Sequence, residues 1–457
     1  MIHDLVIRAA EVYTPLGPLP GAVVVDGERV TAVLAENAPV EARREFRLAP
    51  DEVLIPGVVD SHVHVNEPGR TEWEGFATAT AAAAAGGVTT IIDMPLNSIP
   101  PTITPDALRV KRVAADEACS VDVGFWGGAV PQNLGSLSVL HEAGVFGFKA
   151  FLSPSGVPEF EHLTTAQLGV AAAEIAAFGG LLIVHAEDPN VLADAEAHGV
   201  HGDYPGFVAS RPDAAEITAI EHVIAAVRET GVRAHILHLS SARALPVLAG
   251  AKAEGLPITV ETCPHYLSFA EAEIPAGATQ FKCCPPIRSE ANRDELWQGL
   301  KDGVIDIIAS DHSPSTAEMK YAGGGNFAQA WGGIAGLQVA LPAVWTAAAS
   351  RGVPLESVLE WMCRGTARLV GLTDRGRIEP GARADLAAFA PDAPVRVSAA
   401  ELLHRNPVSA FDGAELIGAV RRTWLAGEVA AETGGADAAP SGPSAPSQGR
   451  GRLLTRP

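Results

Sequence analysis

Side chains that can bind a metal ion end or follow several short apolar runs in the middle of the chain. They are His62, His64, Lys149, His185, His238 and Asp311. Two residues at i and i+2 of a strand point to the same face, so the imidazoles of His62 and His64 can reach one ion. Each candidate alone has a plain structural explanation, such as a core histidine, a buried ion pair or a helix N-cap. Their recurrence at five strand ends favours one shared site.

The residue types of this set indicate a hydrolytic centre with two divalent ions. Imidazoles and a carboxylate suit zinc or a similar ion, and six ligand positions exceed what one tetrahedral zinc can use. Desolvation lowers the pKa of a lysine, and a neutral Lys149 amine can react with carbon dioxide to give a carbamate that bridges two ions. His62, His64 and Asp311 would hold one ion, and His185 and His238 the other. A hydroxide between the ions is a nucleophile at neutral pH, with Asp311 as general base and acid.

Eight continuous apolar runs alternate with alanine-rich stretches that look helical. The runs cover residues 58–60, 89–93, 121–125, 146–149, 181–185, 234–238, 258–261 and 305–309. Such runs are typical of strands buried on both faces. They predict a (β/α)8 TIM-like barrel, whose active site lies at the carboxyl ends of its strands. A doubly wound parallel sheet is the alternative on pattern alone.

The segments on either side of this region favour strands. Short strand candidates separated by Gly and Pro fill the chain up to Leu54, and the β character returns after Gly371, for example at 377–381, 384–389 and 423–428. We therefore predict a composite β domain from 1–54 and 372–432, forming a small β-sandwich, around a barrel at 55–371. The Gly, Ala, Pro and Ser content of 433–449 predicts a disordered linker, and we assign 433–457 as a disordered C-terminal tail, with docking of the basic segment 450–457 as the alternative.

Composition and charge narrow the partners and the compartment. The 457 residues are 47% hydrophobic and carry a formal net charge of −21, which argues against nucleic acid and anionic membranes. The charge-free run 321–350 is broken by Gly and Pro, so it predicts a buried loop and a core helix rather than a membrane span. Five cysteines without a CxxC pair and no visible signal peptide indicate a reducing, cytoplasmic setting.

The ligand set resembles that of the amidohydrolase superfamily. The cyclic amidases of this superfamily (dihydroorotases, hydantoinases and allantoinases) place a carbamylated lysine, N6-carboxylysine, at the position of Lys149. The stretch 376–386 also resembles their shared β-domain signature, and the resemblance covers about residues 1–430. It implies a metal-dependent hydrolase of cyclic amides with zinc as the expected metal, and a homotetramer by analogy with relatives.

Three stretches resemble the allantoinases among these enzymes, namely 60–76, 94–102 and 330–338. Dihydroorotases usually have Arg and Asn where this chain has Asn66 and Leu96, and those residues bind the substrate carboxylate. A carboxylate without such a partner binds poorly. We therefore expect hydrolysis of allantoin to allantoate, with a hydantoinase or dihydropyrimidinase as the alternative, in which Phe151 could serve as the aromatic lid. A non-catalytic scaffold on the same fold is disfavoured because every metal ligand is present.

The resemblance also implies how a small-molecule substrate is bound. Ring recognition in these enzymes depends on backbone groups, and we expect Asn97, Cys284, Gly332 and Gly333 to contact the substrate. A serine would be expected at Cys284, whose weaker S–H donor leaves its role open. Cys283 and Cys284 could equally be small buried residues. His265 belongs to the family pattern, and we expect no metal role for it.

Overall fold

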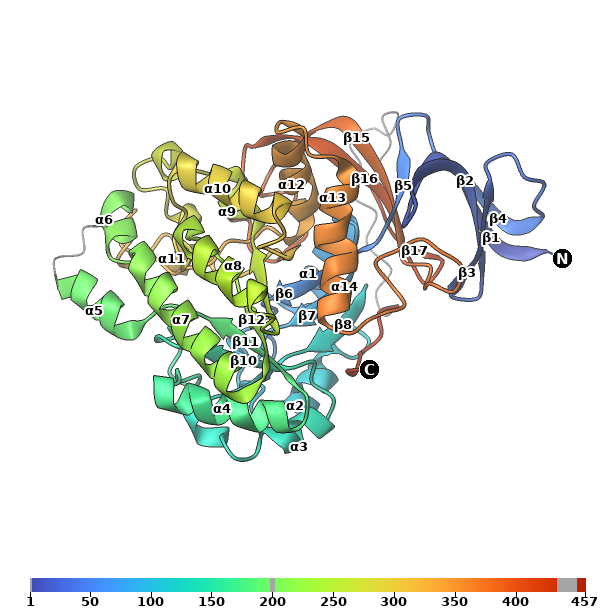
Figure 1. Cartoon of the computed structure of the whole chain (residues 1–457). Coiled ribbons are helices and arrows are strands. Elements are labelled where there is room, and N and C mark those ends of the chain that lie inside the picture. The colour runs from blue at the N-terminus through green and yellow to red at the C-terminus, as the bar shows by residue number, and fades with distance from the viewer. Residues whose placement is uncertain (1, 198–201, 434–449) are drawn as a thin grey trace.

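The computed structural model describes residues 2–197, 202–433 and 450–457, and its middle part is built on parallel strands. These strands are β6 (Val58–Val63), β7 (Val88–Asp93), β8 (Asp122–Phe125), β9 (Gly127–Gly128), β10 (Phe148–Phe151), β11 (Leu181–His185), β12 (Arg233–Ile236), β13 (Ile258–Thr262) and β14 (Ile307–Ile308). They form two sheets, β6-β7-β8 and β14-β13-β12-β11-β10-β9. A parallel bridge between Val63 and His312 joins the first strand to the end of the last. The predicted barrel is therefore confirmed (Figure 1).

The third strand of the barrel is interrupted at Trp126. Its first part, β8, pairs with β7, while its second part, β9, pairs with β10. The indole Nε1 of the buried Trp126 donates to the carbonyl of Ser61 at 2.8 Å, which fixes the ring beside the first strand. The apolar run predicted at 121–125 corresponds to β8 alone, and the sequence pattern did not indicate the short strand β9 beyond Trp126.

Helices alternate with these strands and cover the outside of the barrel (Figure 1). They are α1 (Phe76–Ala85), α2 (Pro105–Ala115), α3 (Leu137–Glu142), α4 (Thr165–Ala177), α5 (Pro189–Ala197), α6 (Tyr204–Ala209), α7 (Asp213–Thr230), α8 (Leu245–Ala253), α9 (Pro264–Ser268), α10 (Glu290–Lys301), α11 (Ala317–Lys320), α12 (Ala340–Ala349), α13 (Leu355–Leu359) and α14 (Gly365–Leu369). Local signals set several boundaries. The Thr164 hydroxyl caps α4, the Ser289 hydroxyl caps α10, and α7 ends at Gly231, whose φ is 70°.

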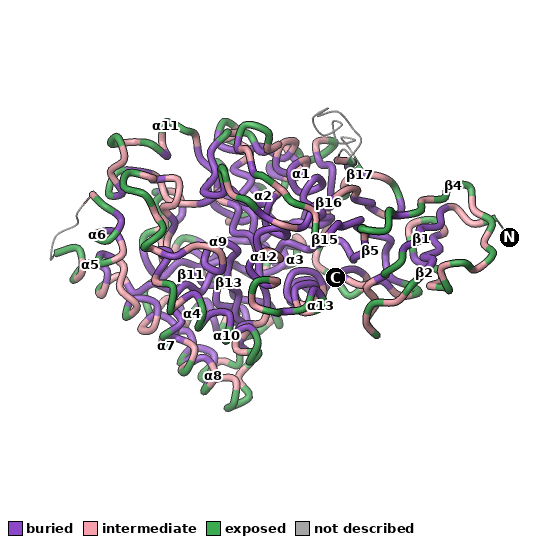
Figure 2. Tube along the Cα trace, turned by 90° about the horizontal axis from the view of Figure 1, so that it is seen from above, coloured by how far each residue is buried: buried purple, intermediate pink, exposed green. Residues whose placement is uncertain are grey.

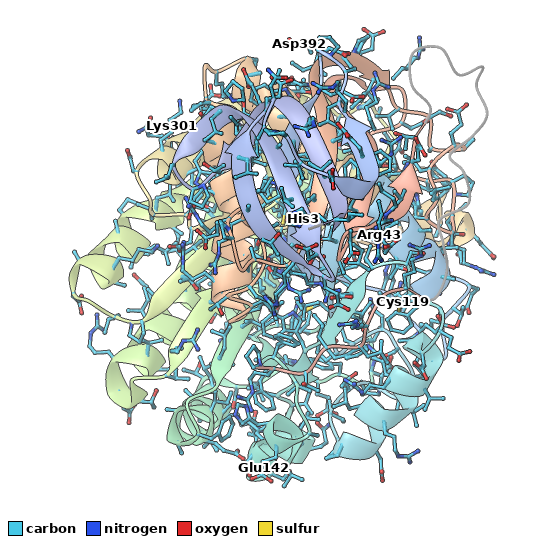
Figure 3. All side chains as sticks on the ribbon, turned by 90° about the vertical axis from the view of Figure 1, so that its right-hand side faces the viewer. His3, Arg43, Cys119, Glu142, Lys301 and Asp392 are labelled. Atoms are coloured by element: carbon cyan, nitrogen blue, oxygen red, sulfur yellow. The ribbon has the colours of Figure 1, made fainter. Side chains whose placement is uncertain are left out.

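The strands of the two chain ends join in one mixed sheet beside the barrel. They are β1 (His3–Thr14), β2 (Gly17–Asp26), β3 (Arg29–Ala35), β4 (Ala42–Arg47), β5 (Val53–Pro56), β15 (Leu386–Arg396), β16 (Glu415–Leu425) and β17 (Glu428–Glu432). The order is β17-β16-β15-β5-β1-β2-β3, with β4 on β1, so the β5–β15 pair connects the two ends of the chain. Figure 3 looks onto this sheet, with His3 and Arg43 labelled on β1 and β4.

One predicted strand of this region is wrong. Residues 377–381 form a turn region rather than a strand, and Gly376 and Gly381 have φ of 74° and 93° there. Such backbone angles interrupt an extended strand and favour glycine. The domain boundaries at 54, 371 and 432 stay a prediction.

Burial follows the layers of the fold. The centre of the barrel and its contacts with the surrounding helices are buried, whereas the outer faces of the helices and the hairpins of the sheet are exposed (Figure 2). The charge-free region 321–350 ends in α12, which is buried along most of its length. In the described ranges, no helix is both long and apolar enough to cross a membrane.

The end of the chain corrects the prediction of a disordered tail at 433–457. Residues 434–449 lie outside the described residues, but 450–457 pack on the barrel. Leu453 forms a parallel bridge with Val123, whose N–H donates to the Arg452 carbonyl. Leu453 and Leu454 pack on different apolar clusters of the core. Apolar contacts and backbone pairing therefore order a segment that composition alone predicted to be disordered. The C-terminus lies beside β8 (Figure 1).

Candidate metal centre and substrate cavity

The six predicted metal ligands gather at the carboxyl ends of the barrel strands. His62 lies in β6 and Lys149 in β10, and His185 ends β11. The remaining ones, His64, His238 and Asp311, follow the ends of β6, β12 and β14. All but His62 line one cavity of about 260 Å³, and His62 is fully buried beside them. Parallel strands with a common direction bring these residues together, as the pattern predicts.

The first group of candidate ligands is closely spaced. Donor atoms of His62, His64 and Asp311 all lie within 4.8 Å of one another. The Asp311 Oδ1 atom is 3.1 Å from His62 Nε2 and 3.5 Å from His64 Nε2. This spacing would let the three side chains hold one ion.

The second group lies directly beside the first. The rings of His185 and His238 are 4.6 Å apart, and the His62 and His238 rings are 5.5 Å apart. Phe151 stacks on His185, and the Lys149 Nζ atom lies 4.7 Å from the centre of the Phe151 ring. Phe151 therefore positions residues of the candidate metal centre, in addition to lining the cavity.

Two of these residues have an unusual backbone conformation. His238 has a φ of 36° and Asp311 a φ of 43°. Residues other than glycine rarely adopt positive φ, and such strain persists only where the surroundings enforce it. In both cases the chain turns sharply just after a strand, which directs the side chain toward the cavity.

Buried acidic residues outside the predicted set orient the histidines. Glu261 accepts a hydrogen bond from His62 Nδ1 at 2.5 Å and contacts His235 Nε2 at 3.1 Å. Glu187 lies 2.7 Å from His185 Nε2 and pairs with Arg211 through two hydrogen bonds. Contacts of this kind fix the tautomer and the ring orientation of a metal-ligating histidine. Sequence analysis missed both carboxylates, although Glu261 stands out as a charge inside an apolar run.

The electrostatics of the cluster indicate a place for positive charge. Burial lowers the pKa of His62, but Asp311 and Glu261 outweigh it and raise that pKa to about 9. Burial lowers the pKa of His64 to about 3 and that of His238 well below its usual value. Burial raises the pKa of Asp311, yet the neighbouring His62 and His64 bring it well below its usual range, so the carboxylate is ionised at neutral pH.

Lys149 has the environment that carbamate formation requires. The side chain is 1% exposed, and burial lowers its pKa to about 8 despite the opposing effect of Asp311 and Glu261. A larger fraction of its amine is therefore neutral near pH 7 than for an exposed lysine.

The donor set fits metal ions. In the part of the chain that the structure describes, His64 Nδ1 and His238 Nδ1 are buried without a hydrogen-bond partner. A buried polar atom without a partner is costly, and a bound cation would remove that cost. Neutral imidazoles and an ionised carboxylate are the ligands that zinc and similar ions prefer.

The predicted substrate-binding residues line the same cavity. Asn97, Cys284, Gly332 and Gly333 all contribute to its wall, together with Leu96. Asn66 differs, because it is fully buried, has a φ of 63° and donates from Nδ2 to the Pro314 carbonyl at 3.3 Å. Asn66 is not among the residues that line the cavity. Of the two positions at which this chain differs from the dihydroorotases, only Leu96 therefore lies in the cavity wall.

Two cationic residues of the cavity wall were missed by sequence analysis. Arg211 and Lys282 both line it, but each has a partner within the protein. Glu187 neutralises the Arg211 guanidinium, and the Lys282 Nζ atom donates to the Ala330 carbonyl at 2.6 Å. Isolated Arg and Lys residues in loops give no sequence signal of this placement.

The cysteines and His265 have distinct surroundings. All five cysteines are free, and Cys284 is more exposed than the buried Cys283. Donor atoms of His265 also lie within 4.8 Å of Cys263 and Asp311. The absence of a metal role for His265 stays a prediction.

Comparison with known proteins shows the class of protein that this fold and site define. The Amidohydrolase family model matches residues 53–430 of the chain. The chain therefore belongs to the amidohydrolase family and is a hydrolase.

Individual relatives refine this assignment. The chain is 57% identical over 425 residues to an allantoinase from Streptomyces avermitilis, covering 93% of this chain and 95% of the relative. It is 43% identical to an allantoinase from Saccharomyces cerevisiae, covering 93% and 91%. Among solved structures it resembles an L-hydantoinase (dihydropyrimidinase) from Arthrobacter aurescens, with a TM-score of 0.91, 31% identity and complete coverage of both chains.

Proposed function

We propose that this chain hydrolyses the ring amide of allantoin to give allantoate. The observation that carries the proposal is the 57% identity to the Streptomyces avermitilis allantoinase over 93% of the chain. The cavity supports it, because candidate metal ligands form one part of the wall and the predicted ring-binding residues another. A hydantoinase is the second candidate, favoured by the likeness to the Arthrobacter aurescens enzyme.

Six residues would hold the cofactor of this reaction. We propose that His62, His64 and Asp311 bind one divalent ion and His185 and His238 the other, with zinc as the expected metal. Lys149, carbamylated to N6-carboxylysine, would contribute to both. Such ions, when bound, supply Lewis-acid activation of water and of an amide carbonyl at neutral pH.

Asp311 would move the proton in this reaction. Because its carboxylate is ionised at neutral pH, it can accept a proton from the attacking water. The water oxygen forms a bond to the ring carbonyl carbon, and the C–N bond of the ring breaks. Asp311 then returns the proton to the departing nitrogen, which becomes part of a ureido group. The new carboxylic acid releases its remaining proton to solvent and leaves as a carboxylate. No other cofactor is needed, because the reaction adds one water molecule.

The cavity wall would favour a neutral ring over a carboxylate-bearing one. Leu96 is apolar, and the Arg211 guanidinium is already paired with Glu187. The other cation of the wall, Lys282, donates to the Ala330 carbonyl. A carboxylate buried there would have to displace an existing partner of one of these cations, which costs several kcal/mol. We therefore propose that dihydroorotate is a poor substrate.

A substrate panel tests the proposal. Initial rates should be measured side by side on allantoin, hydantoin, dihydrouracil and dihydroorotate, with metal content determined on the same sample. We expect allantoin to be turned over fastest and dihydroorotate slower by about 10³-fold or more. Equal rates on allantoin and hydantoin would favour the second candidate, and equal rates on dihydroorotate would contradict the argument from the cavity wall.

The remaining predictions about the setting of the enzyme are proposals of the same kind. We propose a cytoplasmic homotetramer whose partner is its small-molecule substrate, without nucleic acid or membrane. The acidic net charge of −21 supports the exclusion of polyanionic partners. Light scattering on the purified chain measures the oligomeric state directly, and a monomer would contradict it.

A further inference from the structure

A buried lysine that the proposed reaction does not use lies behind the substrate cavity. Lys320 ends the short helix α11 and is 3% exposed. Its Nζ atom donates to the carbonyls of Lys282 at 2.9 Å and Trp331 at 3.0 Å, and also to that of Gly333. Within the described ranges, no carboxylate pairs with this ammonium group, so the backbone carbonyls are its acceptors.

These acceptors belong to the two loops that supply the predicted ring-binding residues. Lys282 precedes Cys283 and Cys284, while Trp331 and Gly333 flank Gly332. The loops are also joined to each other, because the Gly333 N–H donates to the Lys282 carbonyl at 2.9 Å. One ammonium group therefore holds both loops at a common point.

Two backbone N–H groups of these loops remain without a hydrogen-bond partner among the described residues. Lys282, Trp331 and Gly333 use their carbonyls within the protein, as described above. The N–H groups of Cys284 and Gly332, by contrast, have no hydrogen-bond partner among the described residues. Both residues line the cavity and are partly exposed. Free backbone donors in a cavity wall are suited to the carbonyl oxygens of a planar cyclic amide.

We propose that Lys320 is a positioning residue that fixes these two loops so that the peptide groups of Cys284 and Gly332 bind the substrate ring. This inference rests on the proposed function, since it assumes a cyclic amide in the cavity. Pre-ordering the loops lowers the entropy lost on binding, so Lys320 contributes to substrate affinity rather than to the chemical step. We call the three hydrogen bonds from Lys320 Nζ to the two loops the Lys320 clamp. Because hydantoin and allantoin share the ring, the binding of both substrates depends equally on this clamp.

The protonation of Lys320 gives the clamp a pH dependence. Burial, together with Lys282, lowers the pKa of Lys320 to about 7 against the opposing effects of Cys283 and Cys284. His265 also lies near Lys320, and burial lowers its pKa to about 4, so it is neutral near pH 7. Burial raises the pKa of both thiols, which keeps them neutral as well. The ammonium form has three N–H donors for three carbonyls, whereas the neutral amine has two. The clamp is complete below about pH 7 and weakens above it.

The test compares steady-state kinetics of Lys320→Met and Lys320→Gln with those of the parent on allantoin and hydantoin. Met removes every donor, and Gln keeps two. We expect KM to rise about tenfold or more for Met on both substrates and less for Gln, with kcat within about threefold. Metal content should not change. The parent KM should also rise above pH 7, and this rise should be absent in Lys320→Met.

A matched control variant removes a lysine charge at a place outside the cavity wall. Lys252 in α8 donates to the Gly303 carbonyl and to Asp306, and is not among the cavity-lining residues. Lys252→Met should leave KM unchanged. Unchanged KM in both Lys320 variants, or loss of metal with KM unaltered, would overturn the inference. If Lys320→Met does not fold, Lys320→Gln decides alone. A parent active on hydantoin but not on allantoin contradicts the proposed function, while the Lys320 comparison stays measurable on hydantoin.

Discussion

At the scale of single residues, the candidate centre depends on a balance between burial and charge. Lys149 and His64 are buried and lose basicity, whereas His62 gains it from the carboxylates of Asp311 and Glu261. A cation bound among these groups would satisfy the carboxylates without requiring a protonated imidazole. Two residues, Lys149 and Asp311, allow this interpretation to be tested directly.

Replacing Lys149 by alanine should abolish activity and lower the metal content. The variant loses the amine that would form the carbamate, and with it an anionic ligand between the two ions. Activity assays and elemental analysis of the dialysed protein measure both effects, and short-chain carboxylic acids in the buffer should restore part of the rate. A variant with full metal and a near-normal rate would show that Lys149 is not a ligand.

Replacing Asp311 by asparagine should reduce kcat by about 10²-fold or more, the usual size for loss of a general acid–base group. The amide keeps the shape of the side chain but cannot carry the proton. Thermal unfolding provides the control, since the fold should be retained. A rate within about threefold of the parent would remove Asp311 from the proposed mechanism.

At the scale of elements, the broken third strand of the barrel explains the position of the C-terminus. Beyond its pairing with Val123, the segment 450–457 reaches the chain before β10, where the Arg456 N–H donates to the Gly144 carbonyl at 3.1 Å. Arg112 on α2 donates to the carbonyls of Leu453 and Leu454. The segment thus connects strand β8, the loop before β10 and helix α2 at the amino end of the barrel, away from the candidate metal centre.

Deleting residues 450–457 should lower Tm while leaving kcat and KM nearly unchanged. The loss of two partly buried leucines and several backbone hydrogen bonds is of order 1–2 kcal/mol, or about 1–2 °C for a chain of this size. Calorimetry on the truncated protein measures the shift. The double variant Leu453→Ala, Leu454→Ala separates side-chain packing from backbone pairing, and an unchanged Tm in both would mean that the contacts contribute nothing to stability.

At the scale of the whole molecule, the candidate metal centre connects most strands of the barrel. Its ligands come from β6, β10, β11 and the residues after β12 and β14, so any ion bound there joins distant parts of the chain. Binding to the folded state alone stabilises that state by mass action. Metal content and stability should therefore change together.

Removing metal with a chelator should abolish activity and lower Tm, and added zinc should restore both. The reason is that a ligand specific to the folded state contributes RT ln(1 + [L]/Kd), about 2.7 kcal/mol at a hundredfold excess over Kd. Differential scanning calorimetry before and after chelation measures the change. An enzyme that keeps its rate after complete metal removal would contradict the proposed cofactor.

The sequence by itself determined the barrel, because continuous apolar runs mark strands buried on both faces. It also indicated the members of the candidate centre, because metal-binding side chains lie at the carboxyl ends of these runs. It also determined that both chain ends favour strands. Only the tertiary structure decided which groups meet across the chain: Glu261 with His62, Lys320 with the loops that carry Cys284 and Gly332, and Leu453 with Val123. These contacts join segments far apart in sequence, and their formation depends on packing rather than on local pattern. For the same reason composition failed at the C-terminus, where eight residues are ordered by the barrel strand they pair with and not by their own propensity.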